Sequence, residues 1–314
     1  MFCTSEKYLR FVTFTLLGVP GFESFHSLIS APFFIMFVCS VIGNPLIVYI
    51  ILSDRGLHAP MYVFLSLMAI TDFMLSLCVA PQMLAIFWLN SRVVHFSRCV
   101  IQMFFVHFLS YMESGVLVAM AFDRYVAICQ PLRYSIILPG PVITRIGLVL
   151  ALRGVLMVTP CVYLVARLPY CGHGVLSKSY CDHMSIAMAS CGNYTINSIY
   201  GLTQLILAFA FDISAITLSY IFIIKAVLKL QSKEARSKAF GTCSSHVCVI
   251  SFFYIPGGFT VVAYRFGKNI PPSIHSLLSL AYLQMPPMMN PLVYGVRTSQ
   301  IRDHARKLIY KIKM

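Results

Sequence analysis

The sequence is poor in charged residues. Only 11% of its 314 residues are Asp, Glu, Lys or Arg, and 59% are hydrophobic. An ordinary soluble domain carries about 25% charged residues. A water-exposed globule cannot cover its surface with so few charges, so the composition excludes a soluble enzyme. It also excludes a disordered chain, because 24 Phe and 17 Tyr would not stay solvated. We therefore expect the chain to lie in a bilayer.

Acidic residues are the scarcer charged group. Ten Asp and Glu stand against 24 Lys and Arg, which gives a net charge of +14. In a soluble protein this excess would suggest nucleic-acid binding. In a membrane protein it indicates basic loops that face an anionic cytoplasmic leaflet. We therefore expect membrane lipids as partners and no nucleic acid.

Catalytic patterns are also missing from the sequence. It shows no nucleophile and base at a plausible spacing, no glycine loop that would cradle a phosphate, and no set of metal ligands. We predict that the chain is not an enzyme and has no cofactor.

Seven apolar stretches reach the length of about 20 residues that a membrane-spanning helix needs. They predict an all-α integral membrane protein, a seven-transmembrane helix bundle. With the amino terminus outside, 15 cations fall in cytoplasmic segments and 8 in outer segments, which favours this orientation. The expected division is an outer tail (1–27), a seven-helix transmembrane domain (28–296) and a cytoplasmic tail (297–314). The stretches are 28–52, 60–84, 99–122, 143–165, 196–224, 239–264 and 274–296.

The two ends of the chain carry further apolar patterns. Residues 11–18 resemble a short signal-peptide core, but no convincing cleavage site follows. We interpret them as an outer tail that packs on the bundle. Residues 298–312 alternate cations with apolar residues, which predicts a short amphipathic helix on the inner leaflet.

Polar residues inside the spans require an explanation, because they are costly in a bilayer. Asn44, Asp72 and Asn290 lie near mid-depth on three different spans, and Glu113 lies on a fourth. One interpretation is a network of interhelical hydrogen bonds. Another is a sodium or water-filled cavity that a conformational switch collapses. The two interpretations are compatible.

Two further patterns suggest a switch. Asp123-Arg124-Tyr125 ends the third span, where an acid–base pair can be an interfacial anchor or an ionic latch. Pro291, in the run NPLVY, removes a backbone hydrogen bond from the seventh span and leaves a hinge. A latch and a hinged helix together are what a two-state transmembrane switch requires.

The motifs resemble those of odorant receptors, within the rhodopsin-like G-protein-coupled receptors. The run MAFDRYVAIC at 120–129 resembles the family signature, and the resemblance extends from Gly18 to about Lys307. The runs PGFE at 20–23 and YRFG at 264–267 resemble the class I, or fish-like, branch. Three further runs resemble the family: PMY at 60–62, KAFGTC at 238–243 and PMMNP at 287–291.

The resemblance implies a receptor that binds a small volatile odorant in the outer half of the bundle. It implies activation of a heterotrimeric G protein of the stimulatory olfactory type, which raises cAMP. The expected location is the plasma membrane of olfactory cilia. A metabolite-sensing receptor outside the nose is an alternative. A transporter or channel is a weaker one, since the number of spans is odd and no repeat symmetry is visible.

The resemblance also implies two disulfides, Cys99–Cys181 and Cys171–Cys191. The sequence by itself leaves several pairings open. Metal binding is a rival interpretation, because a histidine flanks each of two cysteines: His173 beside Cys171 and His183 beside Cys181. Cysteines locked in disulfides are poor ligands, which weakens that rival.

In class I relatives, the arginine that matches Arg265 clamps a carboxylate, which a guanidinium can hold bidentately. His107 resembles the family's pocket histidine, although a structural role is the alternative. Met184 and Val261 stand where some acid-sensing relatives have polar side chains. We therefore expect a medium-chain carboxylic acid rather than a two- or three-carbon acid. Further candidates for contact with the ligand tail are Phe104, Leu109, Met112, Tyr254 and Phe259.

The remaining implied roles concern signalling and modification. Arg124 and Tyr220 resemble a pair that rearranges on activation. The other expected switch residues are Asp72, Asp123, Tyr125, Asn290, Pro291 and Tyr294. The expected G-protein contacts are Arg133, Tyr134, Lys233 and Arg236, for which anchoring to the leaflet is the alternative. Family members usually carry a glycosylation sequon in the outer tail, whereas here Asn193 heads the only one.

Overall fold

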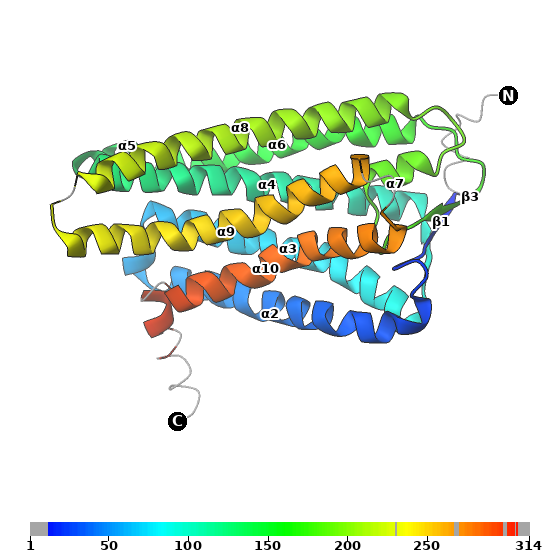
Figure 1. Cartoon of the computed structure of the whole chain (residues 1–314), viewed down its shortest axis with the longest axis horizontal. Coiled ribbons are helices and arrows are strands. Elements are labelled where there is room, and N and C mark those ends of the chain that lie inside the picture. Colours follow the sequence, from blue (N-terminus) through cyan, green and yellow to red (C-terminus); the bar gives the residue numbers. More distant parts are fainter. Residues whose placement is uncertain (1–11, 230, 267–269, 298–299, 305, 307–314) are drawn as a thin grey trace.

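The computed structural model describes residues 12–229, 231–266, 270–297, 300–304 and 306. Within these, the side chains of residues 235, 238, 242, 261–266, 296 and 297 are left out of the description. Seven long helices run side by side along the long axis (Figure 1). They are α2 (His26–Ser53), α3 (Pro60–Leu89), α4 (Phe96–Cys129), α6 (Gly140–Ala166), α8 (Thr195–Leu228), α9 (Lys233–Phe266) and α10 (Pro272–Arg297).

Six of the described helices, all but α10, are long and apolar enough to cross a membrane. Three prolines (Pro286, Pro287 and Pro291), together with serines and amides, make α10 less apolar. It nevertheless packs against α2, α3 and α9 and completes the bundle. The predicted seven-helix bundle is confirmed. Most of the predicted amphipathic helix at 298–312 lies outside the described residues.

The seven helices differ in how deeply they are buried. α3 and α4 lie at the centre, and each carries more buried side chains than any other described helix. α6 and α8 turn large apolar side chains outward, among them Leu152, Leu156, Leu207 and Phe211. In a bilayer such a face is compatible with its surroundings, because lipid tails are as apolar as leucine.

Short segments connect the long helices. Between α2 and α3 lies η2 (Arg55–Leu57), and between α4 and α6 lie η3 (Pro131–Arg133) and α5 (Tyr134–Ile137). Two others are η1 (Glu23–Phe25) before α2 and α7 (His183–Met188) before α8.

A three-stranded sheet covers one end of the bundle, which we call the sheet end. β1 (Thr13–Leu16) lies between β2 (Val93–His95), to which it is antiparallel, and β3 (His173–Leu176), to which it is parallel. Phe14 and Leu16 are fully buried. The apolar segment at 11–18 therefore packs on the bundle as expected, from Val12 onward. The sheet itself was not predicted.

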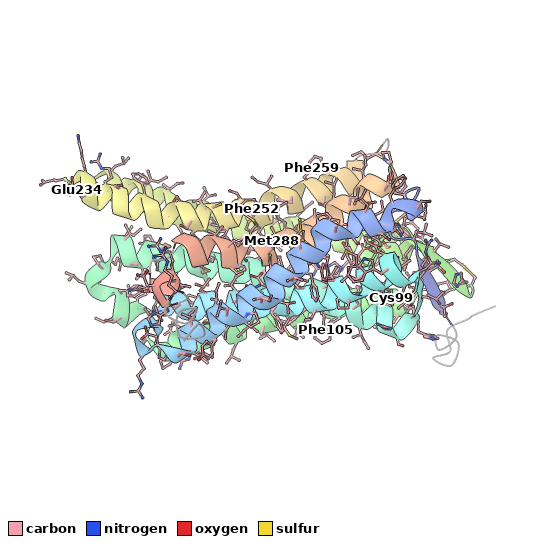
Figure 2. All side chains as sticks on the ribbon, turned by 90° about the horizontal axis from the view of Figure 1, so that it is seen from below. Cys99, Phe105, Glu234, Phe252, Phe259 and Met288 are labelled. Atoms are coloured by element: carbon pink, nitrogen blue, oxygen red, sulfur yellow. A yellow bond between two sulfur atoms is a disulfide. The ribbon has the colours of Figure 1, made fainter. Side chains whose placement is uncertain are left out.

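Both disulfides implied by the resemblance are present at the sheet end. Cys99–Cys181 ties the start of α4 to the segment that follows β3, and Cys171–Cys191 closes the segment between α6 and α8. Figure 2 shows Cys99 at this end and Glu234, on α9, at the opposite end. The crosslinks and the sheet together fix the connecting segments over one mouth of the bundle.

Candidate functional site

A cavity of about 450 Å³ lies within the bundle, towards the sheet end. Side chains from α4, α8, α9 and α10 line it, and Tyr180 and Asp182 close it from the segment between β3 and α7. Most of the lining is apolar or aromatic. A concave apolar space with a few polar groups is the usual form of a small-molecule site.

The sheet end of this cavity is polar. His107 on α4 and Asp182 line it, and the Nζ atom of Lys178 lies 3.3 Å from Oδ1 of Asp182. A smaller adjoining cavity of about 180 Å³ shares His107 and Asp182 and adds Met184. The backbone N–H of His183 donates to Nε2 of His107 at 3.4 Å.

Charge pairing sets the ionisation of the Asp182 carboxylate. Its burial acts to raise the pKa, but the Lys178 ammonium and a hydrogen bond from Ser185 outweigh burial. The pKa of Asp182 is therefore below its ordinary value. The cavity mouth thus carries a paired carboxylate and ammonium rather than a free charge.

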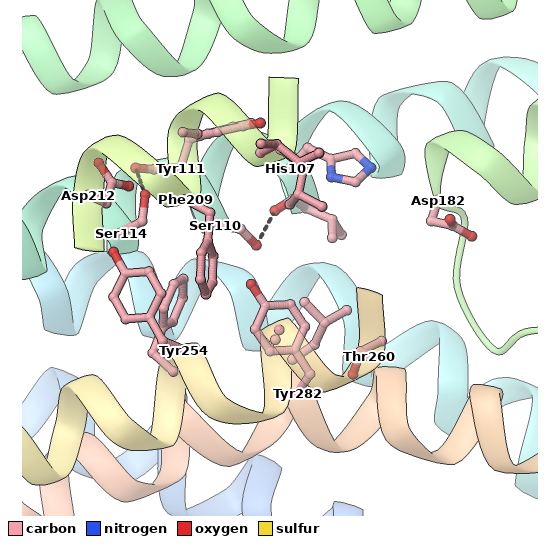
Figure 3. Close-up of a pocket in the computed structure, with 18 of the residues that line it drawn as sticks. His107, Ser110, Tyr111, Ser114, Asp182, Phe209, Asp212, Tyr254, Thr260 and Tyr282 are labelled. Carbon is pink, nitrogen blue, oxygen red and sulfur yellow. Dashed lines mark hydrogen bonds between the residues drawn. The ribbon is translucent and has the colours of Figure 1, made fainter. Parts of the chain in front are cut away.

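The opposite end of the cavity holds an ion pair within the spans. Nη2 of Arg153, on α6, donates to Oδ2 of Asp212, on α8, at 2.8 Å. Asp212 is 1% exposed and lines the cavity together with Ser114 and Tyr254. Figure 3 shows these three groups at one end of the cavity, with His107 at the other.

The structure brings some of the predicted pocket residues together. His107 and Tyr254 line the larger cavity, and Met184 lines the smaller one. Val261 and Arg265 have side chains outside the described residues, so the structure gives only their positions on α9.

Four other predicted pocket residues do not line the described parts of either cavity. The ring of Phe104 stacks on Phe108, with centroids 5.9 Å apart. Leu109 and Met112 are buried in the bundle. Phe259 is 56% exposed and points away from the bundle in Figure 2. The helical spacing in the sequence could not show which of these side chains face the cavity and which face the packed interior or the outside.

The rival metal interpretation finds no support at the two histidines. His173 forms hydrogen bonds with the hydroxyls of Thr13 and Thr15, and His183 forms one with Asn197. Within the part of the chain that the structure describes, no cluster of three or more His, Cys, Asp or Glu has a metal-binding arrangement.

The acid–base motif at the far end of α4 forms a compact cluster. Oδ2 of Asp123 accepts from Nη2 of Arg124 at 2.5 Å, and Oδ1 accepts from the Tyr134 hydroxyl at 2.7 Å. Burial and the Asp123 carboxylate raise the pKa of Tyr134 well above its ordinary value. Tyr220 forms a hydrogen bond with Nδ1 of His246 at 2.8 Å. Arg124 is therefore held by Asp123 in this conformation.

The polar residues at mid-depth form interhelical hydrogen bonds. Nδ2 of Asn290 donates to Oδ2 of Asp72 at 2.7 Å, and Nδ2 of Asn44 donates to the carbonyl of Pro287 at 2.9 Å. These bonds tie α10 to α2 and α3, as the network interpretation expects. Within the described residues, Oε1 of Glu113 and the hydroxyl of Tyr294 have no hydrogen-bond partner although both are buried.

The comparisons with known proteins decide the family. The family model described as olfactory receptor matches residues 33–312. The chain belongs to the olfactory receptor family. It is 49% identical to olfactory receptor 52N2 of Homo sapiens over 94% of this chain and 92% of that one. It is 47% identical to olfactory receptor 52D1 of Homo sapiens over 95% and 94%.

The fold comparison agrees with this assignment. The structure matches squid rhodopsin with a TM-score of 0.72, at 19% identity, over 91% of this chain and 80% of that one. This olfactory receptor is thus a multi-pass membrane protein of the rhodopsin-like G-protein-coupled class and not an enzyme. Its partners are an odorant ligand and a G protein. The resemblance seen in the sequence is confirmed.

The receptor presents cations at the end opposite the sheet. Arg133 and Lys233 are exposed there, and Arg236 lies one turn beyond Lys233 on α9. Tyr134 instead turns its hydroxyl inward to Asp123. Asn193 is exposed between α7 and α8, where its Oδ1 accepts from the N–H of Thr195 at 2.8 Å.

Sequence reasoning assigned no role to Asp212 or Arg153. Each was visible as a charge inside a predicted span, which is a signal of function or pairing. Their partnership requires knowledge of which faces of α6 and α8 meet, and a single sequence does not supply that.

Proposed function

We propose that this receptor binds medium-chain carboxylic acids in the larger cavity and signals through a stimulatory olfactory-type G protein, which raises cAMP. The observation that carries the proposal is the form of the cavity: about 450 Å³, mostly apolar, with His107 at its sheet end. An acid would place its carboxylate at this polar end and its carbon chain among the apolar side chains.

The register of α9 supports Arg265 as the carboxylate partner. Tyr254 and Gly258 both line the cavity from this helix. Position 265 follows them by eleven and seven residues, about three and two turns, which is the same face of an α-helix. The position is also nearer the sheet end than either. A guanidinium there would meet a carboxylate at the mouth of the cavity.

We further propose that the sheet end faces the outside and the Arg124 end faces the cytoplasm. Both disulfides lie at the sheet end, and disulfides persist on an oxidising face. Exposed Arg133 and Lys233 lie at the other end, as the positive-inside rule favours. In this orientation the G protein meets Arg133, Lys233 and Arg236, and Asn193 is available for glycosylation. We place the receptor in the plasma membrane of olfactory cilia.

Activation would proceed by a shift between two conformations. A ligand that binds the active conformation about a hundredfold better shifts the equilibrium by about 2.7 kcal/mol. The elements that would rearrange are the Asp123–Arg124 latch, Tyr125, Tyr220 and Tyr294 near it, and the Asp72–Asn290 bond beside Pro291.

The test is a cAMP assay in cells that express the receptor, with straight-chain carboxylic acids and the matching alcohols. We expect the acids to raise cAMP and Arg265→Ala to reduce their potency at least about tenfold, the loss of one charge-assisted pair. Lys268→Ala removes another cation, three residues further along the sequence, and serves as the matched control. Unchanged potency of acids on Arg265→Ala at equal surface staining would contradict the proposed clamp.

A further inference from the structure

The end of the cavity remote from the sheet contains two polar groups that are left unused. Oδ1 of Asp212 and the hydroxyl of Tyr254 form no hydrogen bond of full geometry within the described residues, and the two side chains lie close enough together to interact with each other. Both residues line the cavity, and they are 1% and 6% exposed. Figure 3 shows the Tyr254 hydroxyl pointing towards the Asp212 carboxylate. A buried polar atom without a partner carries a cost that a bound group can remove.

The charge on Asp212 is already balanced. Its other oxygen, Oδ2, accepts from Arg153 at 2.8 Å. The guanidinium of Arg153 in turn lies 5.9 Å from the ring centroid of Tyr111 and 6.0 Å from that of Phe211. The site therefore offers a hydrogen-bond acceptor without an excess negative charge. A cationic amine would gain little there, because Arg153 already neutralises the carboxylate.

The two unused groups complement a hydroxyl. Oδ1 of Asp212 can only accept a hydrogen bond, whereas the Tyr254 hydroxyl can donate one. An alcohol group donates and accepts at once, so it can donate to Asp212 and accept from Tyr254. An ether can only accept, and a hydrocarbon can do neither.

The location sets the length of the ligand. His107 and Ser114 mark the two ends of the cavity along α4. Seven residues separate them, which corresponds to about 10 Å of helix. A group held at Asp212 therefore lies about one medium-length carbon chain from the polar sheet end.

We infer that Asp212 and Tyr254, backed by Arg153, form a second polar subsite that binds a neutral hydroxyl group of the odorant. The inference rests on the proposed function only in taking this cavity as the odorant site. The ligands it favours are medium-chain compounds with a hydroxyl at the end remote from the sheet, including hydroxy acids.

The experiment measures thermal unfolding of the purified receptor in detergent with 1-octanol and with octyl methyl ether. Neither probe has a carboxylate and no G protein is present, so the result is independent of the Arg265 clamp and of cAMP coupling. We expect 1-octanol to stabilise the receptor at a concentration about tenfold lower than the ether, as one hydrogen bond to a charged group predicts.

Three variants locate the effect. In Tyr254→Phe, alcohol and ether both lose the bond that they accept, so both stabilise the receptor only at higher concentration, and the preference for the alcohol stays at about tenfold because it comes from the bond donated to Asp212. In the double variant Arg153→Met with Asp212→Leu, both charges leave together, which buried pairs often tolerate, and the preference disappears. Tyr282→Phe removes a hydroxyl from the same cavity nearer Ser110 (Figure 3) and keeps the preference.

Equal stabilisation of the wild type by alcohol and ether, or by neither, overturns the inference. A preference that survives in the double variant also overturns it, because the alcohol would then bind elsewhere. A failure of carboxylic acids in the cAMP assay, with the alcohol preference intact, would contradict the proposed acid ligand and leave this subsite standing.

Discussion

The hydroxyl of Tyr134 donates a hydrogen bond to Oδ1 of Asp123 across a distance of 2.7 Å. Because Oδ2 of the same carboxylate holds Arg124, Asp123 joins α4 to the short helix α5. Asp123 is fully buried, so both bonds form away from bulk water. The residue expected to contact the G protein thus also secures the latch in this conformation.

Removing the Tyr134 hydroxyl should loosen the latch. In Tyr134→Phe, Asp123 loses one of its two hydrogen-bond partners. This should destabilise the conformation in which the latch is closed by about 1–3 kcal/mol. If the latch holds the inactive conformation, basal cAMP should rise several-fold in cells without odorant. Tyr163→Phe, on an exposed face of α6, is the matched control and should leave basal cAMP unchanged. Equal basal cAMP in wild type and Tyr134→Phe would show that this bond does not restrain activation.

The two disulfides should differ in their effect on folding. Cys99–Cys181 closes a separation of 82 residues and Cys171–Cys191 one of 20. Loop-closure entropy gives about 4.5 kcal/mol for the longer loop and about 3.3 kcal/mol for the shorter one. We expect Cys99→Ser to abolish surface staining and Cys171→Ser to reduce it. Normal staining of Cys99→Ser would contradict a structural role for this crosslink.

Gly43 allows α2 and α10 to approach at Pro291. A β-carbon at position 43 would lie 2.7 Å from Cβ of Pro291, too close for either backbone to remain in place. We expect Gly43→Ala to lower the free energy of unfolding by about 1–3 kcal/mol, the usual cost of overpacking. Gly295→Ala, on α10, meets no described atom within 4 Å and is the control. Thermal unfolding of both variants tests the contact; equal midpoints would refute it.

The Lys178–Asp182 pair predicts how the cavity mouth responds to pH. The folded pKa of Asp182 is lowered from 3.8, so the pair stabilises the fold at pH values above 3.8 and loses this contribution as the pH falls below it. Between about pH 5 and about pH 8 the contribution of Asp182 is constant. Thermal unfolding of wild type and Asp182→Asn should therefore differ by a constant amount in that range. A difference that shrinks between pH 7 and pH 5 would contradict the pairing.

The sequence predicted the helices better than the contacts between them. Six of the seven long helices are strongly apolar stretches that must satisfy their own backbone hydrogen bonds in a bilayer, so composition alone locates them. The motif around Arg124 and the two disulfides followed from the family resemblance. These features depend on local sequence or on positions that the family shares.

The remaining features depend on which faces meet in three dimensions. β1 has four residues and pairs with segments about 80 and 160 positions away, which no local pattern reveals. Arg153 and Asp212 appeared as two isolated charges until α6 and α8 were placed together. Phe259 was expected in the pocket, but its side chain faces outward. When a helix is apolar on all sides, its sequence pattern does not show which face lines the interior.

The central claim is that the larger cavity receives the odorant. Gly258 lines the cavity on α9, and a β-carbon there would meet only the ring of Phe209, at 3.5 Å. Gly258→Leu should therefore fill the cavity without disturbing the fold. Its neighbour Phe259 faces outward, so Phe259→Leu is the matched control.

The decisive measurement is the cAMP dose–response of wild type, Gly258→Leu and Phe259→Leu to the most potent straight-chain acid or alcohol, at equal surface staining. The account predicts that Gly258→Leu loses potency by at least about tenfold, because the ligand must compete with the added side chain. Phe259→Leu should respond as the wild type does. Wild-type potency in Gly258→Leu would contradict the claim that odorants bind in this cavity.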